Sequence, residues 1–193
     1  MIIGLTGGSG TGKSTACEFF KKTGFVIIDS DEVSREVCRK GEACLDEIVE
    51  VFGAGVLDAE GNLMRHSLGD IVFNDKEKLL ALNEITHKYI IGKIEDIINR
   101  NKHKNIVLDA PLLFETGLDK LCHMNICVLS EKENRIRRII LRDGISLEQA
   151  TARIESQPND KFYISRCDIA FYNNGDMELL MDHLKEEFGN GKI

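Results

Sequence analysis

The sequence predicts an α/β protein built on a five-stranded parallel sheet. Five short apolar runs are continuous rather than alternating, which is typical of strands that are covered on both faces. Helical stretches separate these runs, and such alternation produces parallel strands joined by right-handed crossovers. The predicted strands are residues 2–5, 25–28, 106–108, 125–129 and 168–172.

The first predicted strand leads into a helix over residues 14–22, which is an ordinary connection. The connection between the second and third strands is longer than a simple crossover, because more than 70 residues separate them. Within it, one helical face carries a regular series of apolar residues, which predicts a packed helical insertion. The members of this series are Leu79, Leu82, Ile85, Tyr89, Ile94 and Ile97.

The connection after the fourth strand also contains more than one helix. A helix is predicted to about Arg142, followed by a break at Asp143 and Gly144. Ser146 and Gln149 have the spacing of a capping box, so a second helix is expected there. The sequence thus predicts a helical lid with hinges. The expected organisation is a core of residues 1–30, 105–130 and 167–193, a helical insertion of residues 31–104, and a lid of residues 131–166.

Composition narrows the classes of function. The 193 residues carry 25 Lys and Arg against 32 Asp and Glu, a net charge of −7, which argues against a protein that coats nucleic acid. No apolar run is long enough to span a membrane, and no signal segment precedes the first strand. Six cysteines without a Cys-x-x-Cys pair are expected to be reduced thiols. We therefore expect a cytoplasmic protein that requires no nucleic acid, membrane or protein partner.

Residues 7–14, Gly-Gly-Ser-Gly-Thr-Gly-Lys-Ser, match the phosphate-binding motif Gly-x-x-x-x-Gly-Lys-[Ser/Thr]. The glycines let backbone N–H groups point at a phosphate, and the following helix adds the positive end of its dipole. Lys13 is expected to reach the β- and γ-phosphates, and Ser14 to place its hydroxyl on Mg²⁺. We therefore predict a P-loop site for ATP and Mg²⁺. Its expected residues are Gly8, Gly10, Thr11, Gly12, Lys13, Ser14 and Thr15.

The rest of the chain favours a small-molecule kinase among P-loop proteins. A switch GTPase would need a guanine-reading Asn-Lys-x-Asp, and the nearest segment, residues 101–104, ends in Lys. A motor or AAA-type ATPase would be larger. Another small-metabolite or nucleoside monophosphate kinase and a non-catalytic nucleotide switch stay open as alternatives.

Acidic and apolar residues follow two of the predicted strands, at the sheet end where open α/β folds bind ligands. Of Asp29 and Asp31, one is expected to cap the next helix and the other to accept a proton from the acceptor hydroxyl. The residues alone do not decide which. Asp109 either holds Mg²⁺ through water or simply ends its strand. Leu112 and Leu113 are either core residues or a wall of the acceptor site.

Positive charge is concentrated in the predicted lid. Six of the ten arginines fall between residues 135 and 166, and this segment carries seven positive and four negative charges, a net of +3. Arginine forks suit the oxygens of a transferring phosphoryl group. Arg138 and Arg142 share a helix face, and both are expected to bind the nucleotide, with Arg142 as the triphosphate clamp. Arg135 and Arg137 are expected to be solvated ion-pair partners.

The ordered motifs resemble the dephospho-CoA kinase family over nearly the whole chain. They are residues 4–14, 29–31, 35–37, 52–53, 61–65, 72–73, 82–87, 111–115, 142–144, 153–157 and 173–175. The resemblance implies transfer of the ATP γ-phosphate to the ribose 3′-hydroxyl of dephospho-CoA, the final step of coenzyme A biosynthesis. It also implies three parts, which are a P-loop kinase core, a helical acceptor-binding insertion at residues 31–104 and a lid.

The same resemblance assigns roles to single residues. It implies that Asp31 is the catalytic base and that Arg142 is a lid arginine. The acceptor-binding residues that it implies are Asp31, Arg65, His87, Leu112 and Leu113. One departure is visible, because the family usually has His-Pro where this chain has His87 followed by Lys88.

Overall fold

The computed structural model describes residues 1–175 and 177–189, and within them five strands form one parallel sheet. The strands follow the order β2-β3-β1-β4-β5. Every predicted strand is present, with ends shifted by at most one residue, so the predicted fold class is confirmed. The strands are β1 (Ile2–Thr6), β2 (Val26–Asp29), β3 (Ile106–Asp109), β4 (Met124–Leu129) and β5 (Ile169–Tyr172).

The central strand β1 determines which residues meet at the carboxyl end of the sheet. It pairs in parallel with β3 on one side and with β4 on the other. Leu5 lies opposite Asp109 of β3 and opposite Ile126 of β4. The segment that follows Thr6 therefore leaves the sheet next to the end of β3.

The chain divides into two compact units. The first takes in Met1–Ile28 and the described residues from Asn101 onward, and the second is Asp29–Arg100. The insertion expected at residues 31–104 overlaps the second unit, with small differences at both ends. Those differences arise because Asp29 already caps the first helix of the second unit, and because the last helix of that unit ends at Arg100.

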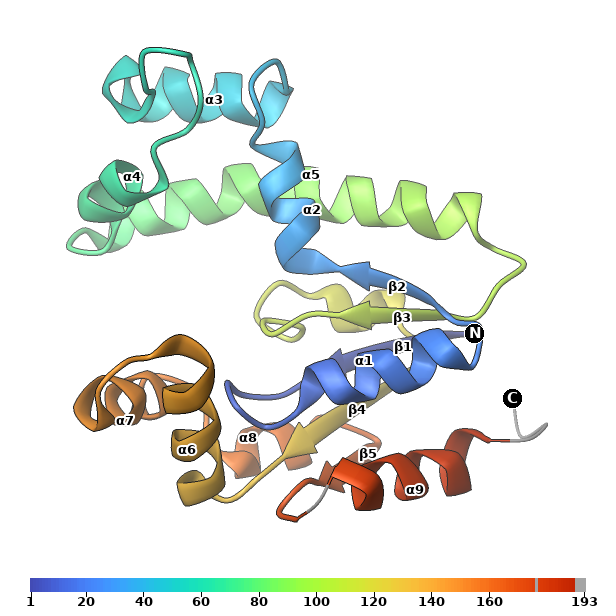
Figure 1. Ribbon diagram of the computed structural model, residues 1–193. Coiled ribbons are helices and arrows are strands. Elements are labelled where there is room, and N and C mark those ends of the chain that lie inside the picture. The colour runs from blue at the N-terminus through green and yellow to red at the C-terminus, as the bar shows by residue number, and fades with distance from the viewer. Residues whose placement is uncertain (176, 190–193) are drawn as a thin grey trace. The chain divides into compact units, whose positions relative to one another are not determined.

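The first unit has its main core on one face of the sheet. Helices α1 (Lys13–Lys22) and α9 (Met177–Phe188) cover that face (Figure 1). On the other face, α8 (Asp160–Ile164) packs Tyr163 against β4, and the short helix η2 (Leu118–Leu121) lies near β1. Cover on both faces explains why the strand residues are continuously apolar. The aromatic residues of the main core are Phe19, Phe20, Phe25, Phe171 and Phe188.

The predicted lid contains α6 (Lys132–Asp143) and α7 (Leu147–Glu155), which pack through Ile139, Ala150 and Ile154. The break between them is as predicted, since Gly144 adopts φ 66°. The Ser146 capping box is also formed. The last part of residues 131–166 differs from a free flap, because Tyr163 of α8 is only 4% exposed and anchors that part to the sheet.

The second unit is helical. Its elements are α2 (Ser30–Val37), α3 (Ala43–Phe52), η1 (Ala54–Val56), α4 (Arg65–Val72) and α5 (Lys76–Arg100). The long helix α5 packs against α2, α3 and α4. Of the apolar face predicted for it, Ile85 and Ile94 are buried and the other members are half-buried. No helix in the described part of the chain is long and apolar enough to cross a membrane.

Candidate functional site

The phosphate-binding motif forms a tight loop between β1 and α1. Gly7, Gly10 and Gly12 adopt φ values of 144°, 77° and 104°, which residues with a Cβ rarely reach. Neighbours also leave no room for a side chain. A Cβ on Gly12 would lie 2.1 Å from Nδ2 of Asn173, and one on Gly8 would lie 2.3 Å from an Arg135 guanidinium nitrogen. Glycine is therefore required for both reasons at this loop.

The loop closes on itself before α1 begins. The buried hydroxyl of Thr11 donates a hydrogen bond to the Gly8 carbonyl at 2.9 Å, so this side chain supports the loop rather than facing a ligand. The first N–H groups of α1 have no carbonyl one turn earlier in the helix and are suited to an anion. Ser14 is exposed in that first turn and Thr15 is half-buried. A hydroxyl at this position can ligate Mg²⁺.

Lys13 and Asp109 form an ion pair beside the loop. The Lys13 Nζ lies 2.5 Å from Oδ1 of Asp109, and both side chains are 16% exposed. The Cys17 thiol donates to the other carboxylate oxygen at 3.2 Å. Asp109 thus faces the phosphate-binding loop, which is the position it needs to ligate a metal ion or to orient Lys13. Sequence reasoning had left open that it merely ends β3.

Arg138 of α6 is hydrogen-bonded to carbonyl groups of the loop. Its guanidinium donates to the Gly10 carbonyl at 3.1 Å and to the Asn173 carbonyl at 3.0 Å. Asn173, at the end of β5, donates from Nδ2 to the Thr11 carbonyl at 2.8 Å, and the Ser130 hydroxyl donates to the Asn173 carbonyl at 2.7 Å. In this structure Arg138 therefore contacts the carbonyl side of the loop. Asn173 and Ser130 were missed, since each occurs in the sequence as an ordinary strand-ending residue.

Arg135 does not have the solvated position expected of it. Its side chain is only 5% exposed and contacts the loop directly, with Nε donating to the Ser9 carbonyl at 2.9 Å. Burial lowers the pKa of this guanidinium. The pattern of residues along α6 cannot predict this contact, because the residues that bury Arg135 come from distant parts of the sequence. Arg137, by contrast, is exposed as predicted.

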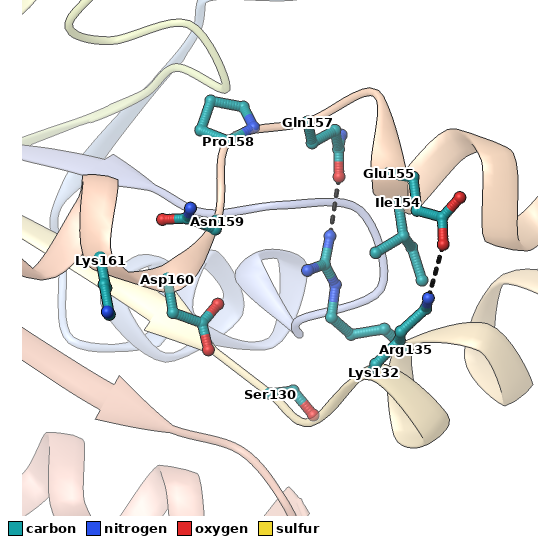
Figure 2. A pocket seen from close by; sticks show the side chains of 10 residues that line it. All are labelled: Ser130, Lys132, Arg135, Ile154, Glu155, Gln157, Pro158, Asn159, Asp160 and Lys161. Carbon is teal, nitrogen blue, oxygen red and sulfur yellow. Dashed lines mark hydrogen bonds and ion pairs between the residues drawn. The ribbon is translucent and has the colours of Figure 1, made fainter.

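A cavity of about 750 Å³ lies against Arg135 (Figure 2). Arg135 and Gln157 are hydrogen-bonded along one side of it, and the Lys132–Glu155 ion pair, 2.7 Å long, lies along another. The cavity carries charges of both signs, since Asp160 and Lys161 also line it.

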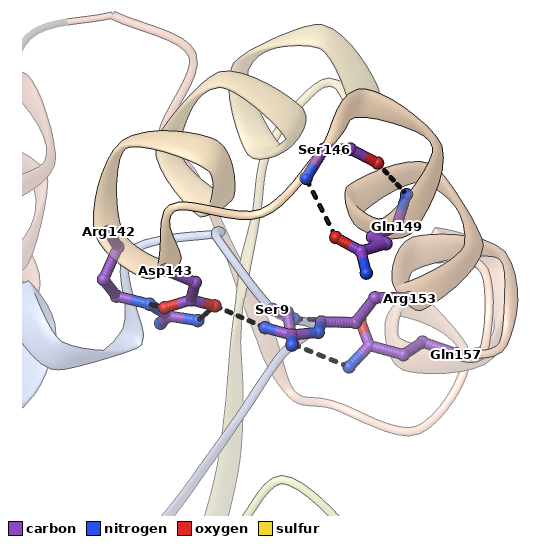
Figure 3. Close-up of polar contacts among 7 residues, drawn as sticks. All are labelled: Ser9, Arg142, Asp143, Ser146, Gln149, Arg153 and Gln157. Carbon is purple, nitrogen blue, oxygen red and sulfur yellow. Dashed lines mark hydrogen bonds and ion pairs between the residues drawn. The ribbon is translucent and has the colours of Figure 1, made fainter.

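Arg142 is bound to its neighbour in the lid (Figure 3). Its Nε and Nη2 donate to the Asp143 carboxylate at 2.7 and 3.0 Å, and Arg153 of α7 donates to the same carboxylate. These bonds, those from Arg142 first, lower the pKa of Asp143 to about 2. The Arg142 side chain is 61% exposed. Its expected contact with a triphosphate stays a prediction.

In the second unit, Asp29 rather than Asp31 caps the N-terminus of helix α2. Its Oδ1 accepts hydrogen bonds from the N–H groups of Asp31 at 2.8 Å and Glu32 at 3.1 Å. Helix α2 consequently begins at Ser30, directly after its cap. Asp31 is exposed in the first turn of α2. A capping role is thereby assigned to Asp29, and the proton-accepting role stays a prediction for Asp31.

Two further predicted acceptor residues lie in the same unit. Arg65 is exposed at the start of α4, and its charge acts on Cys38. Together with the hydrogen bond from Cys44, which has the larger effect, it lowers the pKa of the Cys38 thiol to about 7. His87 is half-buried in α5, and burial lowers its pKa. Burial therefore favours the neutral form of the His87 imidazole.

The residue after His87 lies within an unbroken helix. Lys88 is in the middle of α5, where proline would remove a backbone hydrogen bond. Its Nζ lies 2.6 Å from the carboxylate of Glu47 in α3, which also accepts a hydrogen bond from Tyr89 at 2.9 Å. The departure from His-Pro is therefore matched by a contact between α5 and α3.

The two leucines after β3 have different surroundings. Leu113 is fully buried in the first unit and packs there as a core residue, and its expected part in the acceptor wall stays a prediction. Leu112 is 56% exposed and can still meet a ligand.

Comparison with known proteins identifies relatives along the whole length. A family model described as dephospho-CoA kinase matches residues 1–178. A dephospho-CoA kinase of Fusobacterium nucleatum is 39% identical over 178 residues, which cover 92% of either chain. The crystal structure of TT1252 from Thermus thermophilus is 30% identical with a TM-score of 0.83, covering 96% of this chain and 95% of that one. A dephospho-CoA kinase from Campylobacter jejuni is 26% identical with a TM-score of 0.69, covering 100% and 98%.

Proposed function

The chain belongs to the dephospho-CoA kinase family, and we propose that it transfers the γ-phosphoryl group of ATP to the ribose 3′-hydroxyl of dephospho-CoA. The products are CoA and ADP, so the reaction completes coenzyme A biosynthesis. The observation that carries the proposal is the P-loop with Lys13 held on Asp109, in a chain that the family model matches over residues 1–178.

The P-loop binds the ATP phosphates in this proposal. Backbone N–H groups from Gly10 to Ser14 surround the β-phosphate, and Lys13 neutralises charge that builds up on the γ-phosphoryl oxygens. Because glycines at Gly8, Gly10 and Gly12 leave the backbone bare, phosphate oxygens can approach it closely.

Mg²⁺ fits the oxygen donors that the structure offers. The exposed Ser14 hydroxyl and the Asp109 carboxylate belong to the same unit, and oxygen is the donor that Mg²⁺ prefers. When bound, the ion would neutralise phosphate charge. Since Lys13 already pairs with Asp109, a metal on Asp109 would compete with the ammonium group, and we propose that Ser14 is the direct ligand.

Asp31 is the proposed base for the acceptor hydroxyl. Its carboxylate is exposed, while the neighbouring Asp29 is committed to the α2 cap. Accepting the proton as the new O–P bond forms makes the ribose oxygen a better nucleophile. Arg65, His87 and Leu112 are proposed acceptor contacts.

The parts of the chain have separate proposed tasks. The helical second unit binds the acceptor, and α6 and α7 close over the nucleotide as a lid that carries Arg142. Closure would exclude water and so suppress ATP hydrolysis. A cytoplasmic location completes the proposal. None of the six cysteines, all of which the structure describes, forms a disulfide, which suits a reducing compartment.

The direct test is a coupled ADP-release assay with ATP, Mg²⁺ and dephospho-CoA. We expect ADP release far above the rate with water as the acceptor, and a product heavier by one phosphoryl group. AMP, CMP and shikimate serve as competing acceptors. Turnover with dephospho-CoA no faster than with water would overturn the proposed function, and faster turnover with another acceptor would reassign it.

A further inference from the structure

Ser9 of the P-loop has every one of its polar groups bound by two side chains from outside the loop. Its N–H donates to Oε1 of Gln157 at 2.9 Å, and its hydroxyl accepts from Nε2 of the same side chain at 3.0 Å (Figure 3). Its carbonyl accepts from Nε of Arg135 at 2.9 Å. The two side chains are themselves joined, since Nη2 of Arg135 donates to Oε1 of Gln157 at 2.8 Å.

The hydrogen bonds to Ser9 restrict the backbone at a position flanked by two flexible glycines. Ser9 lies between Gly8 and Gly10, and glycines confer large backbone freedom that must be lost when a phosphate binds. With its N–H given to Gln157, Ser9 is not a phosphate donor. Its contacts instead fix the backbone conformation of the first half of the loop. Preset donors bind a developing charge better than donors that must first reorganise.

The base of this contact is fixed to the sheet. Gln157 lies between α7 and α8, and α8 is anchored by Tyr163 against Cys127 and Leu129 of β4. Arg135 is 5% exposed and belongs to the first turns of α6. The P-loop is thus hydrogen-bonded to the start of α6 and to the segment between α7 and α8, where the lid joins the core.

We propose that Gln157 and Arg135 are positioning residues for phosphoryl transfer, which hold Ser9 and thereby preset the P-loop for the ATP phosphates. This inference rests on the proposed function for its kinetic readout. It assigns neither side chain a direct contact with substrate.

The principal test compares Gln157→Ala with Gln149→Ala. Gln149 is also a lid glutamine bound to a serine, but it caps α7 through Ser146 and is not bonded to the loop (Figure 3). We expect Gln157→Ala to raise the KM for ATP about tenfold while the KM for dephospho-CoA changes less than twofold. Gln149→Ala should change both less than twofold. A KM for ATP that is equal in the two variants would overturn the proposal.

Conservative variants and a second site separate positioning from folding. Gln157→Glu can still accept from Ser9 and Arg135 and should retain ATP affinity within about threefold, whereas the shorter Gln157→Asn should resemble Gln157→Ala. Ser9→Ala should weaken ATP binding in the wild type and add nothing to Gln157→Ala. An equal loss in both backgrounds would show that Gln157 does not act through Ser9.

Arg135 is tested by chemical rescue, because the cavity lies against it. In Arg135→Ala, added guanidinium at millimolar concentration should restore at least part of the lost ATP affinity, with no effect on Gln149→Ala. A folded Arg135→Ala variant that binds ATP like the wild type, or that guanidinium does not rescue, overturns the role of Arg135. ATP affinity is measured by titration without acceptor. A wild type that ignores dephospho-CoA would therefore refute the proposed function and leave this test intact.

Discussion

Lys13 shows how one residue combines structure with proposed chemistry. Its ammonium group lies in an ion pair with Asp109, and that pair joins the start of α1 to the end of β3. An ammonium group held close to the loop needs little reorganisation to meet a phosphate. The same carboxylate restrains where the Lys13 side chain can point.

We expect Lys13→Ala to lower kcat by roughly 10²–10³, which is typical when one preset electrostatic group is removed. Steady-state ADP release with dephospho-CoA measures it. Lys21→Ala, which removes an exposed lysine from the same helix, is the control and should stay near wild-type turnover. A loss of less than fivefold in Lys13→Ala would contradict the assignment.

Asp29, the last residue of β2, and Asp31, in the first turn of α2, offer a matched pair of variants. Asn caps helices as well as Asp does, so Asp29→Asn should keep the α2 cap and turnover within about threefold. Asp31→Asn removes the proposed base and should lower kcat roughly 100-fold with little change in ATP affinity. Rapid-quench kinetics and ATP titration measure the two effects. Equal losses in both variants, or a parallel loss of ATP binding in Asp31→Asn, would refute the role of Asp31.

At the scale of elements, ion pairs connect α6 and α7 across the joint between them, although the glycine between them alone would predict a flexible hinge. Gly144 ends α6 and Ser146 caps α7, but Asp143 spans the gap by binding Arg142 on one helix and Arg153 on the other. The two lid helices are thereby linked by charge as well as by their shared apolar contact.

The joint should depend on pH in a defined direction. The pKa of Asp143 is lowered to about 2 from 3.8, first by its hydrogen bonds with Arg142. A carboxylate with a lowered pKa stabilises the fold above its ordinary pKa, and this contribution is lost as the pH falls towards 2. The melting temperature of Asp143→Asn should therefore lie below that of the wild type by a constant amount from pH 7 to about pH 5. The difference should shrink below pH 4, and one that grew on acidification would contradict the ion-pair account.

Arg142 itself should matter more for transfer than for folding. Its side chain is 61% exposed, and substitutions at such positions usually change stability by less than about 0.5 kcal/mol. We expect Arg142→Ala to lower kcat/KM for ATP at least tenfold, with a melting temperature within about 2 °C of the wild type. Arg137→Ala, exposed on the same helix, is the control. Wild-type kinetics in Arg142→Ala would remove it from the triphosphate site.

At the scale of the whole molecule, an acidic protein is proposed to bind polyanions. The net charge is −7, yet the segment from residue 135 to 166 carries +3 and the P-loop adds Lys13 and its N–H groups. Local placement therefore decides binding, while the acidic remainder favours solubility.

Nucleotide binding should stabilise the whole fold only when the phosphate site is intact. At a concentration 100 times its Kd, a ligand adds about 2.7 kcal/mol to the free energy of unfolding. We expect ATP with Mg²⁺ to raise the melting temperature by several degrees, and EDTA to reduce this shift and to abolish turnover until Mg²⁺ is restored. Lys13→Ala should lack most of the shift. Full turnover in EDTA would exclude the proposed metal.

The sequence was most informative where a local residue pattern is compatible with a single backbone conformation. Continuous apolar runs predicted all five strands to within a residue, and glycine spacing predicted the phosphate loop, because both depend on neighbouring residues alone. The Ser146 capping box was readable for the same reason. These features follow from periodicity and from allowed φ values.

Only the tertiary structure decided which side chains meet. Arg135 was expected to be solvated, but it is buried and donates a hydrogen bond to the Ser9 carbonyl. For Leu113 the residues left open a core position or an acceptor wall, and the structure buries its side chain in the core. Gln157 and Asn173 lie about 150 residues from the loop they hold, a separation that no local pattern bridges. The sequence by itself thus determined the scaffold and the phosphate motif. Packing of distant segments determined the surroundings of each side chain, because burial and hydrogen-bond partners exist only once the chain has folded.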